Sequence, residues 1–364
     1  MSLIARGVVV RAPGEASKVE ELIVEEPGPG EVLVRIQATG VCHTDMHASR
    51  GTMGTQFPYL LGHEGAGVVQ AVGPGVSRPA VGDPVVLAYR VPCDRCRYCL
   101  RGAPARCATP PEAGPRLRAR SDGQVLTRVS RLGTFATHTV VAASQAITIP
   151  PGIAPEAACL IGCGVMTGYG AVAYTADLHP GRTVAVFGCG GVGINVVQGA
   201  RLLRAERVIA VDVSEQKLGW AQAFGATHTI DAKTEDPVTR IKELTGGLGV
   251  DAVFDTVGQP RTVLQALRSC DFGGRCVLLA IPETAATVEI GLSELHWQRC
   301  DIRSSWYGDC LPASDFPMLA TWYLRGDLML DELITARIGL GDVADAFAAL
   351  SSGTTLRSVI VPDH

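Results

Sequence analysis

The chain has 364 residues, 47% of them hydrophobic, and a formal net charge of −4 at pH 7. A chain of this length is expected to form more than one domain. The acidic balance argues against a general nucleic-acid or membrane-surface binder. The N-terminus shows no signal-peptide pattern, and we find no uncharged apolar run near the ~18 residues that span a bilayer. We therefore expect a soluble, cytoplasmic protein without membrane or nucleic-acid partners.

Residues 1–150 consist of short β-rich runs separated by Gly and Pro. The runs RGVVV, EVLVRI, GAGVVQAV and DPVVLA are typical of strands, and no long amphipathic helix accompanies them. This pattern predicts a β-barrel-like domain with functional loops. Residues 108–132 are polar and rich in arginine, so we expect them to form a surface lobe.

Within this part, four cysteines follow a C-x₂-C-x₂-C-x₇-C pattern: Cys93, Cys96, Cys99 and Cys107. Thiolates at this spacing can surround one tetrahedral Zn²⁺ and leave no open coordination position, which is typical of a structural site. Neighbouring arginines favour the thiolate form. Reduced free thiols and an iron–sulfur cluster are the alternatives, but nothing else in the chain indicates electron transfer.

A second set of metal-ligand side chains is scattered through the sequence: Cys42, His63, Glu64 and Cys163. Two thiolates and one imidazole make a zinc site with a fourth position free for water or substrate. Glu64 directly follows His63 and could act as a transient alternative ligand. Asp45 could orient the imidazole of His63, because ligating histidines usually donate their other N–H to a carboxylate.

From residue 156 onward, helical stretches alternate with the apolar runs TVAVFG, RVIAVD, HTID, DAVFDTVG and GRCVLLAI. This alternation predicts a parallel sheet covered on both faces. After residue 305 the segments are mixed, and the final strand-like LRSVIV is expected to rejoin the first domain. The predicted domains are therefore residues 1–164, 165–305 and 306–364, the last returning to the first.

The first apolar run leads directly into Gly188-x-Gly190-x-x-Gly193 and then into a helical pattern. These glycines allow a tight turn, a close approach to a pyrophosphate, and close helix–strand packing. The helix N-terminus at Gly191 and Val192 offers unpaired N–H groups to phosphates. Asp212 ends the next strand, where a carboxylate binds the ribose hydroxyls and favours NAD over NADP. Lys217 could reach the same ribose or could be a solvated helix lysine.

The remaining cysteines lie mostly among apolar residues, and we interpret them as small buried hydrophobic side chains. They are Cys159, Cys189, Cys270, Cys276, Cys300 and Cys310.

The motifs GVCHTD, GHEGAG, GCGVMTG and GCGGVG, with the four-cysteine run, resemble the zinc-dependent medium-chain alcohol dehydrogenase family in the expected order. The segments FGATHT, SSWYGDCLPASDFP and LRSVIV are most similar to its class III branch, the mycothiol-dependent formaldehyde (S-(hydroxymethyl)mycothiol) dehydrogenases. The resemblance implies a GroES-like β-barrel catalytic domain and a Rossmann doubly wound parallel-sheet domain. It also implies NAD, two Zn²⁺ per chain and a homo-oligomer, most often a dimer.

Several site roles follow from this resemblance, position by position. Cys42, His63 and Cys163 match the catalytic zinc ligands. The other matches are Thr44 for the substrate oxygen, His47 for proton release to solvent, and His43 and Arg357 for the cofactor pyrophosphate.

The expected reaction is hydride transfer from an alcohol, or from an S-hydroxymethyl-thiol adduct, to NAD. Another primary alcohol or aldehyde as substrate is one alternative, and a non-catalytic zinc-ribbon binding protein is a remote one. Five arginines of the lobe could bind a charged thiol or could form a solvated basic loop: Arg116, Arg118, Arg120, Arg128 and Arg131.

Overall fold

The computed structural model describes residues 2–363, which form two compact units. The first unit runs to Cys163 and resumes at Leu311, and the second is Gly164–Cys310. The domain limits expected from the sequence stay a prediction, because compactness alone does not show which segments fold independently.

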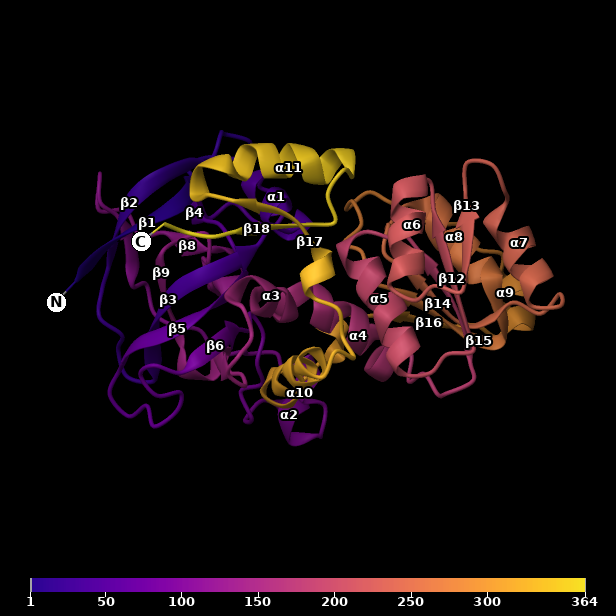
Figure 1. Cartoon of the computed structure of the whole chain (residues 1–364), viewed down its shortest axis with the longest axis horizontal. Coiled ribbons are helices and arrows are strands. Elements are labelled where there is room, and N and C mark those ends of the chain that lie inside the picture. Colours follow the sequence, from indigo (N-terminus) through magenta and orange to yellow (C-terminus); the bar gives the residue numbers. More distant parts are fainter. Residues whose placement is uncertain (1, 364) are drawn as a thin grey trace. The chain divides into compact units, whose positions relative to one another are not determined.

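The first unit is built mainly from two β-sheets (Figure 1). One sheet has the strand order β7-β2-β1-β4-β8. Its long antiparallel pair joins β1 to β2 from Leu3↔Val24 to Val9↔Lys18. The bounds of its strands are β1 Leu3–Val10, β2 Lys18–Val24, β4 Tyr59–Leu60, β7 Leu117–Ala119 and β8 Thr127–Arg128.

The second sheet of this unit has the order β10-β6-β5-β3-β18-β17, and β9 also pairs with β3. Its strands are β3 Glu31–Gly40, β5 Glu64–Val72, β6 Pro84–Leu87, β9 His138–Ala142, β10 Ala146–Thr148, β17 Ile334–Ile338 and β18 Arg357–Ile360. The C-terminal LRSVIV run supplies β18, which lies antiparallel to β3. Buried valines, leucines and isoleucines fill the space around both sheets.

Helices in this unit are short near the N-terminus and longer near the C-terminus (Figure 1). They are α1 His43–Ser49, α2 Arg97–Leu100, α3 Pro155–Leu160, α10 Pro312–Leu324 and α11 Val343–Ser352. The absence of a long helix before residue 150 agrees with the sequence prediction for the part of the chain described.

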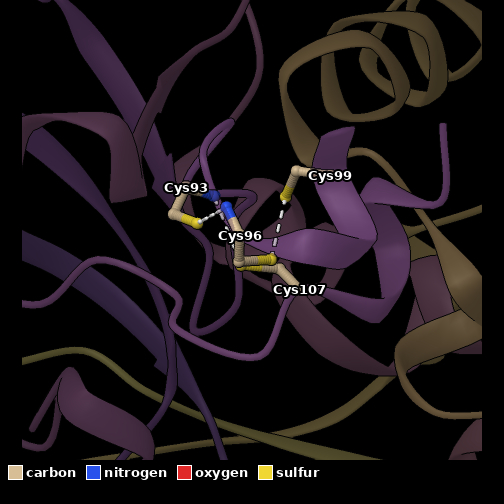
Figure 2. Close-up of side chains that lie close together, drawn as sticks. All are labelled: Cys93, Cys96, Cys99 and Cys107. Atoms are coloured by element: carbon tan, nitrogen blue, oxygen red, sulfur yellow. Dashed lines mark hydrogen bonds between the residues drawn. The ribbon is translucent and has the colours of Figure 1, made fainter. Parts of the chain in front are cut away.

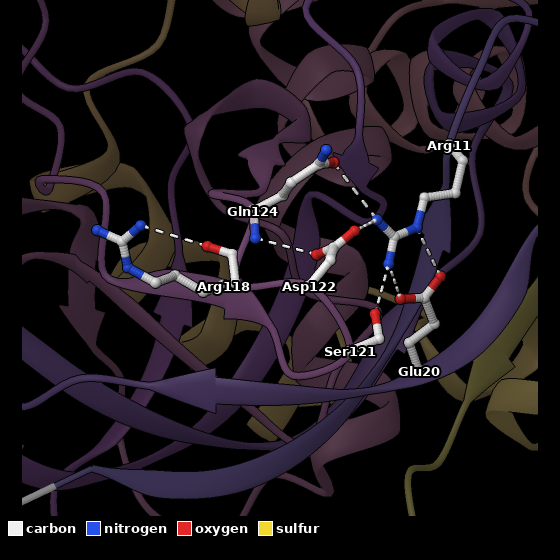
Figure 3. Close-up of polar contacts among 7 residues, drawn as sticks. Arg11, Glu20, Arg118, Ser121, Asp122 and Gln124 are labelled. Atoms are coloured by element: carbon white, nitrogen blue, oxygen red, sulfur yellow. Dashed lines mark hydrogen bonds and ion pairs between the residues drawn. The ribbon is translucent and has the colours of Figure 1, made fainter.

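One arginine holds the tip of the lobe against the first sheet (Figure 3). Arg11, just after β1, donates from Nε to Oε1 of Glu20 at 2.9 Å. Its Nη1 donates to Oδ2 of Asp122 at 2.7 Å, in the turn that follows β7. Because Glu20 lies on β2, this arginine joins three segments of the lobe and sheet through charge-assisted hydrogen bonds.

The second unit is a six-stranded parallel sheet with the order β13-β12-β11-β14-β15-β16, which confirms the predicted doubly wound arrangement. Its strands are β11 Thr183–Phe187, β12 Arg207–Asp212, β13 His228–Asp231, β14 Val250–Asp255, β15 Cys270–Leu278 and β16 Asp301–Ser304. Its helices are α4 Met166–Gly170, α5 Gly191–Leu202, α6 Glu215–Ala223, α7 Pro237–Leu244, α8 Pro260–Ser269 and α9 Leu292–Gln298. Because strand order reverses after β13, right-handed crossovers place α5 and α6 on one face and the later helices on the other (Figure 1).

One expectation about apolar runs was wrong. Pro155–Thr175 forms a 21-residue helical segment that is long and apolar enough to cross a bilayer. Small residues such as Gly and Ala keep this segment apolar without the bulky side chains that mark an obvious span. However, 83% of its most apolar 18-residue stretch is buried in the structure. A buried core helix of a soluble protein can have the same length and composition.

A buried carboxylate fastens the lobe to the second sheet. Glu31, at the start of β3, is only 7% exposed. Its Oε1 accepts from the Gly114 N–H at 2.6 Å, and its Oε2 accepts from the Gly28 N–H and Arg116 Nε, each at 2.7 Å. Burial favours the protonated carboxyl, but the hydrogen bonds from Gly114, Gly28 and Arg116 outweigh it and lower the pKa of Glu31.

We expect Glu31→Gln to lower the free energy of unfolding by about 1–3 kcal/mol at pH 7, because a buried charged acceptor is lost. A carboxyl whose pKa is lowered on folding stabilises the protein above its ordinary pKa of 4.5. That contribution disappears as the pH falls through the lower folded value. The difference between wild type and variant in urea unfolding should therefore shrink below pH 4.5.

Glu15→Gln is the matched control, because it removes the same charge at an exposed position. An equal loss of stability in both variants, or a difference that grows in acid, would contradict the role given to Glu31.

Candidate metal centres and dinucleotide site

The four cysteines of residues 93–107 converge in one loop of the first unit (Figure 2). Their sulfur atoms all lie within 4.8 Å of one another. The Sγ of Cys96 lies 3.6 Å from that of Cys99 and 3.9 Å from that of Cys107. Four thiolates bound to Zn²⁺ at ~2.3 Å stand about 3.8 Å apart in a tetrahedron, so the loop fits this ion.

Local hydrogen bonds favour the thiolate form at two of the four cysteines, whereas burial raises the pKa of Cys99 to about 11. The Thr109 hydroxyl lowers the pKa of Cys93 to about 6. The backbone N–H of Cys99 lowers the pKa of Cys96 to about 7. The guanidinium of Arg90 also donates to the carbonyl of Cys107 and fixes the far end of the loop. A thiolate is the form that binds metal, so these contacts prepare the loop for its ion.

The second predicted set also comes together. Ligand atoms of Cys42, His63, Glu64 and Cys163 all lie within 4.8 Å of one another. Cys42 is the N-cap residue of α1, His63 directly precedes β5, and Cys163 lies in the π-helical turn Ile161–Val165. Segments far apart in sequence therefore meet at one buried point, as the ligand prediction requires.

Asp45 holds two of these segments together, which confirms its predicted contact with His63. Its carboxylate is fully buried, and its Oδ1 lies 3.0 Å from Nδ1 of His63. The same oxygen accepts from the Gly62 N–H at 3.0 Å, and Oδ2 accepts from the Cys42 N–H at 3.3 Å. The two backbone contacts were not expected from the sequence. An acidic residue at the third position of a helix, as Asp45 is in α1, is nevertheless a known capping signal.

The arrangement leaves the other imidazole nitrogen facing the sulfur atoms. Among the described residues, Nε2 of the buried His63 has no hydrogen-bond partner. A buried nitrogen of this kind normally has a partner, so its state requires an explanation. Two sulfur donors and one imidazole nitrogen around a common point are the ligand set that a catalytic Zn²⁺ takes, and the site fits that ion.

The charges around the site were only partly predicted. The hydrogen bond between the two thiols lowers the pKa of Cys42 and raises that of Cys163. Burial raises the pKa of Glu64, although the charge of Arg357 acts in the opposite direction. Arg357 donates directly to Oε2 of Glu64 and is itself only 5% exposed. The predicted contact of Arg357 with a pyrophosphate stays a prediction, and its ion pair with Glu64 was missed.

The remaining residues of the predicted relay lie on α1. Thr44 and His47 are partly buried and three residues apart, so they share one face of the helix. Nδ1 of His47 lies 3.4 Å from Oγ1 of Thr52. His43, the first residue of α1, is exposed.

The glycine loop of the second unit needs each of its glycines for a different reason. Gly188 has a φ of +89°, which favours glycine, and a Cβ at Gly193 would lie 1.8 Å from the carbonyl oxygen of Gly188. A Cβ at Gly190 would meet no atom within 4 Å. The space beside Gly190 is therefore open, as binding of a pyrophosphate would require. Gly191 and Val192 begin α5.

Asp212 lies at the end of β12, beside this loop. Its Oδ2 accepts from the Cys189 N–H at 2.8 Å, and its Oδ1 accepts from the Ser214 N–H at 2.9 Å. Lys217 is partly buried in the first turns of α6. Thr256 was missed: its hydroxyl donates to the Gly188 carbonyl at 2.9 Å and supports the loop. Its place just after strand β14 was the available signal, because binding residues gather at the carboxyl ends of parallel strands.

The lobe arginines are engaged by the protein. Arg116, Arg118, Arg120 and Arg131 each form an ion pair with a glutamate at 3.6 Å or less. Arg128 donates to the carbonyl oxygens of Val140 and Ala113. These contacts give all five arginines a structural explanation.

Comparison with known proteins agrees with both units. Residues 28–151 match the alcohol dehydrogenase GroES-like domain, and residues 191–325 match the zinc-binding dehydrogenase family. The chain is 36% identical over 357 residues to a Mycobacterium tuberculosis protein named "Putative alcohol dehydrogenase D", covering 96% of this chain and 97% of that protein.

Two further matches span the whole molecule. An Escherichia coli S-(hydroxymethyl)glutathione dehydrogenase is 35% identical over 366 residues, covering 98% of this chain and 99% of that one. The crystal structure of an alcohol dehydrogenase zinc-binding domain protein from Burkholderia ambifaria superposes with a TM-score of 0.95 at 33% identity, covering 100% of both chains. The GroES-like and Rossmann fold prediction is confirmed, and the non-catalytic zinc-ribbon alternative is excluded. The chain belongs to the zinc-dependent medium-chain alcohol dehydrogenase family and is an oxidoreductase of CH–OH donors.

Proposed function

We propose that this protein oxidises the S-hydroxymethyl adduct of formaldehyde and a small thiol, mycothiol, with NAD as the acceptor. The observation that carries the enzymatic part is the buried meeting of Cys42, His63 and Cys163, with Nε2 of His63 left without a hydrogen-bond partner among the described residues. The named E. coli relative acts, by its name, on the corresponding glutathione adduct. The choice of mycothiol rests on the motif resemblance stated above.

Zinc held by Cys42, His63 and Cys163 would supply a Lewis acid that makes the substrate hydroxyl more acidic. Asp45 fixes the imidazole of His63, so the ring keeps Nε2 toward the ligand point. The Thr44 hydroxyl would accept the proton of the substrate hydroxyl and pass its own proton on, through the ribose of the cofactor, to His47 on the same helix face. The partly exposed His47 then gives that proton a route to water.

In the second unit, NAD would supply the hydride acceptor. The N–H groups at the start of α5 bind its phosphates beside Gly190. The carboxylate of Asp212, already oriented by two backbone N–H groups, accepts the ribose hydroxyls and repels a 2′-phosphate.

A second candidate function is oxidation of a primary alcohol that carries no thiol. The contacts of the lobe arginines favour it over an adduct of a carboxylate-bearing thiol, because each guanidinium is already held by a carboxylate or a carbonyl. A carboxylate-bearing thiol such as glutathione would then have to be bound elsewhere or compete with these ion pairs, whereas mycothiol has no carboxylate that requires an arginine.

For the metal site, we expect wild type to bind two zinc ions per chain and Cys163→Ala to bind one. Loss of a Lewis acid that contributes several kcal/mol should lower kcat by roughly 10³-fold or more. Metal analysis and steady-state kinetics measure both effects. Cys159→Ala is the matched control, because Cys159 is also buried and lies one helical turn earlier on the same segment. Near-normal kcat or two zinc ions in the Cys163 variant would overturn the site.

For the cofactor site, Asp212→Ala should lower kcat/KM for NAD about 10- to 100-fold, since hydrogen bonds to a charged group contribute ~1.5–3 kcal/mol. The NADP reaction should change less, so the preference for NAD narrows. Asp231→Ala is the control, because Asp231 sits at the matching register position of the next strand. An unchanged NAD to NADP ratio would show that another residue sets the preference.

For the substrate, NADH formation should require both formaldehyde and mycothiol, with glutathione a poorer partner. The assay compares formaldehyde alone, formaldehyde with each thiol, and a series of primary alcohols. Activity on the alcohols that exceeds the thiol-dependent rate would support the second candidate and reject the mycothiol adduct as the substrate.

A further inference from the structure

Three cysteines that belong to neither metal site lie in one apolar cluster of the second unit. Cys270 begins β15, Cys276 lies within β15, and Cys300 directly precedes β16. They are 3%, 1% and 9% exposed, so Cys300 is the most accessible of the three. Their burial agrees with the sequence expectation, but their gathering in one cluster was not expected.

A metal site does not explain this gathering. In residues 2–363, only the two groups described above bring three or more ligand atoms within 4.8 Å of one another. The three sulfur atoms of this cluster therefore do not surround one ion. The remaining explanation for the cluster is a disulfide formed between two of the three thiols.

The strand register excludes two of the three possible pairs. Cys270 is opposite Val250 and Cys276 is opposite Val253, with a bulge of β15 between the two positions. Along β14 the two positions are three residues apart, about 10 Å. Cys276 is opposite Ile302, two residues beyond Cys300, which places those Cα atoms about 8 Å apart across neighbouring strands. A disulfide requires Cα atoms within ~7 Å, so neither pair can close without movement of the backbone.

The remaining pair is held together by a side chain next to it. Nε2 of Gln298 donates to the carbonyl of Cys270 at 3.3 Å and to the carbonyl of Leu267 at 2.6 Å. This fixes the segment before β16 against the start of β15. The Cys270 thiol is in contact with the thiols of both Cys276 and Cys300, and these contacts raise the pKa of Cys270. The contact with Cys270 lowers the pKa of Cys300.

We propose that Cys300 and Cys270 form a hydroperoxide-reactive thiol pair. The Cys300 sulfur attacks one peroxide oxygen, the O–O bond breaks, and the other oxygen leaves as an alcohol or water. The resulting sulfenic acid is attacked by the Cys270 thiol, which forms the S–S bond and releases water. Two thiols are oxidised to one disulfide, and one hydroperoxide is reduced by the same two electrons.

The position of the pair predicts that its oxidation spares activity. Cys270 and Cys300 lie at the amino ends of β15 and β16. Gly188 and Asp212 lie at the carboxyl ends of their strands in the same parallel sheet. Because the cofactor residues are at the opposite edge, the cross-link should leave kcat and KM within about twofold.

The test treats the zinc-loaded wild-type enzyme with about two equivalents of hydrogen peroxide and maps its peptides without reduction. We expect a Cys270–Cys300 cross-link together with retained activity. Cys276→Ser is the matched control and should form the same cross-link. Cys270→Ser should stop at a sulfenic acid on Cys300, which dimedone traps.

Native labelling of wild type with iodoacetamide keeps the test decisive if a variant fails to fold. Cys300 should react faster than Cys270 and Cys276. A cross-link that includes Cys276, or the absence of a Cys270–Cys300 cross-link, would overturn the proposal. A large loss of activity when Cys270 and Cys300 are cross-linked, or equal labelling of the three thiols, would also overturn it.

Discussion

The predicted zinc ligand set depends on one fully buried carboxylate. Asp45 accepts hydrogen bonds at the start of α1 and just before β5, and it also contacts His63. Burial raises the pKa of Asp45, while the contact with His63 acts in the opposite direction. A buried carboxylate needs partners of this kind, because an isolated ionised carboxylate is very costly to desolvate. The same contacts that satisfy Asp45 therefore fix the separation of two ligand-bearing segments.

The parts of the site that sequence could predict are those whose reasons are local. A Cβ at Gly193 would collide with the carbonyl of Gly188, five residues away, so the glycine pattern directly reflects the turn that it forms. The spacing of the four cysteines likewise reflects a single loop. The parallel sheet was also predictable, because strands that are buried on both faces have continuous runs of apolar residues in the sequence.

Contacts between distant segments were less predictable. Arg357 and Glu64 are 293 residues apart in sequence and form a buried ion pair. No local pattern distinguishes this arginine from a surface one, because the partner is set by the pairing of β18 with β3. Removing either charge would leave the other buried without its partner, which is why such pairs are hard to replace singly. The support that Thr256 gives to the glycine loop has the same origin, since it depends on β14 lying next to β11.

The parallel sheet of the second unit also separates two kinds of chemistry. In a parallel sheet all strands point one way, so every loop that follows a strand opens at one edge and every loop that precedes a strand opens at the other. The Gly188 loop and Asp212 use the first edge, whereas Cys270 and Cys300 lie at the second. A modification at the second edge would act on the ends where strands begin, and the β-ladder between the edges would keep the predicted cofactor residues in register. Oxidation of the proposed thiol pair in this unit is therefore expected to leave hydride transfer unchanged.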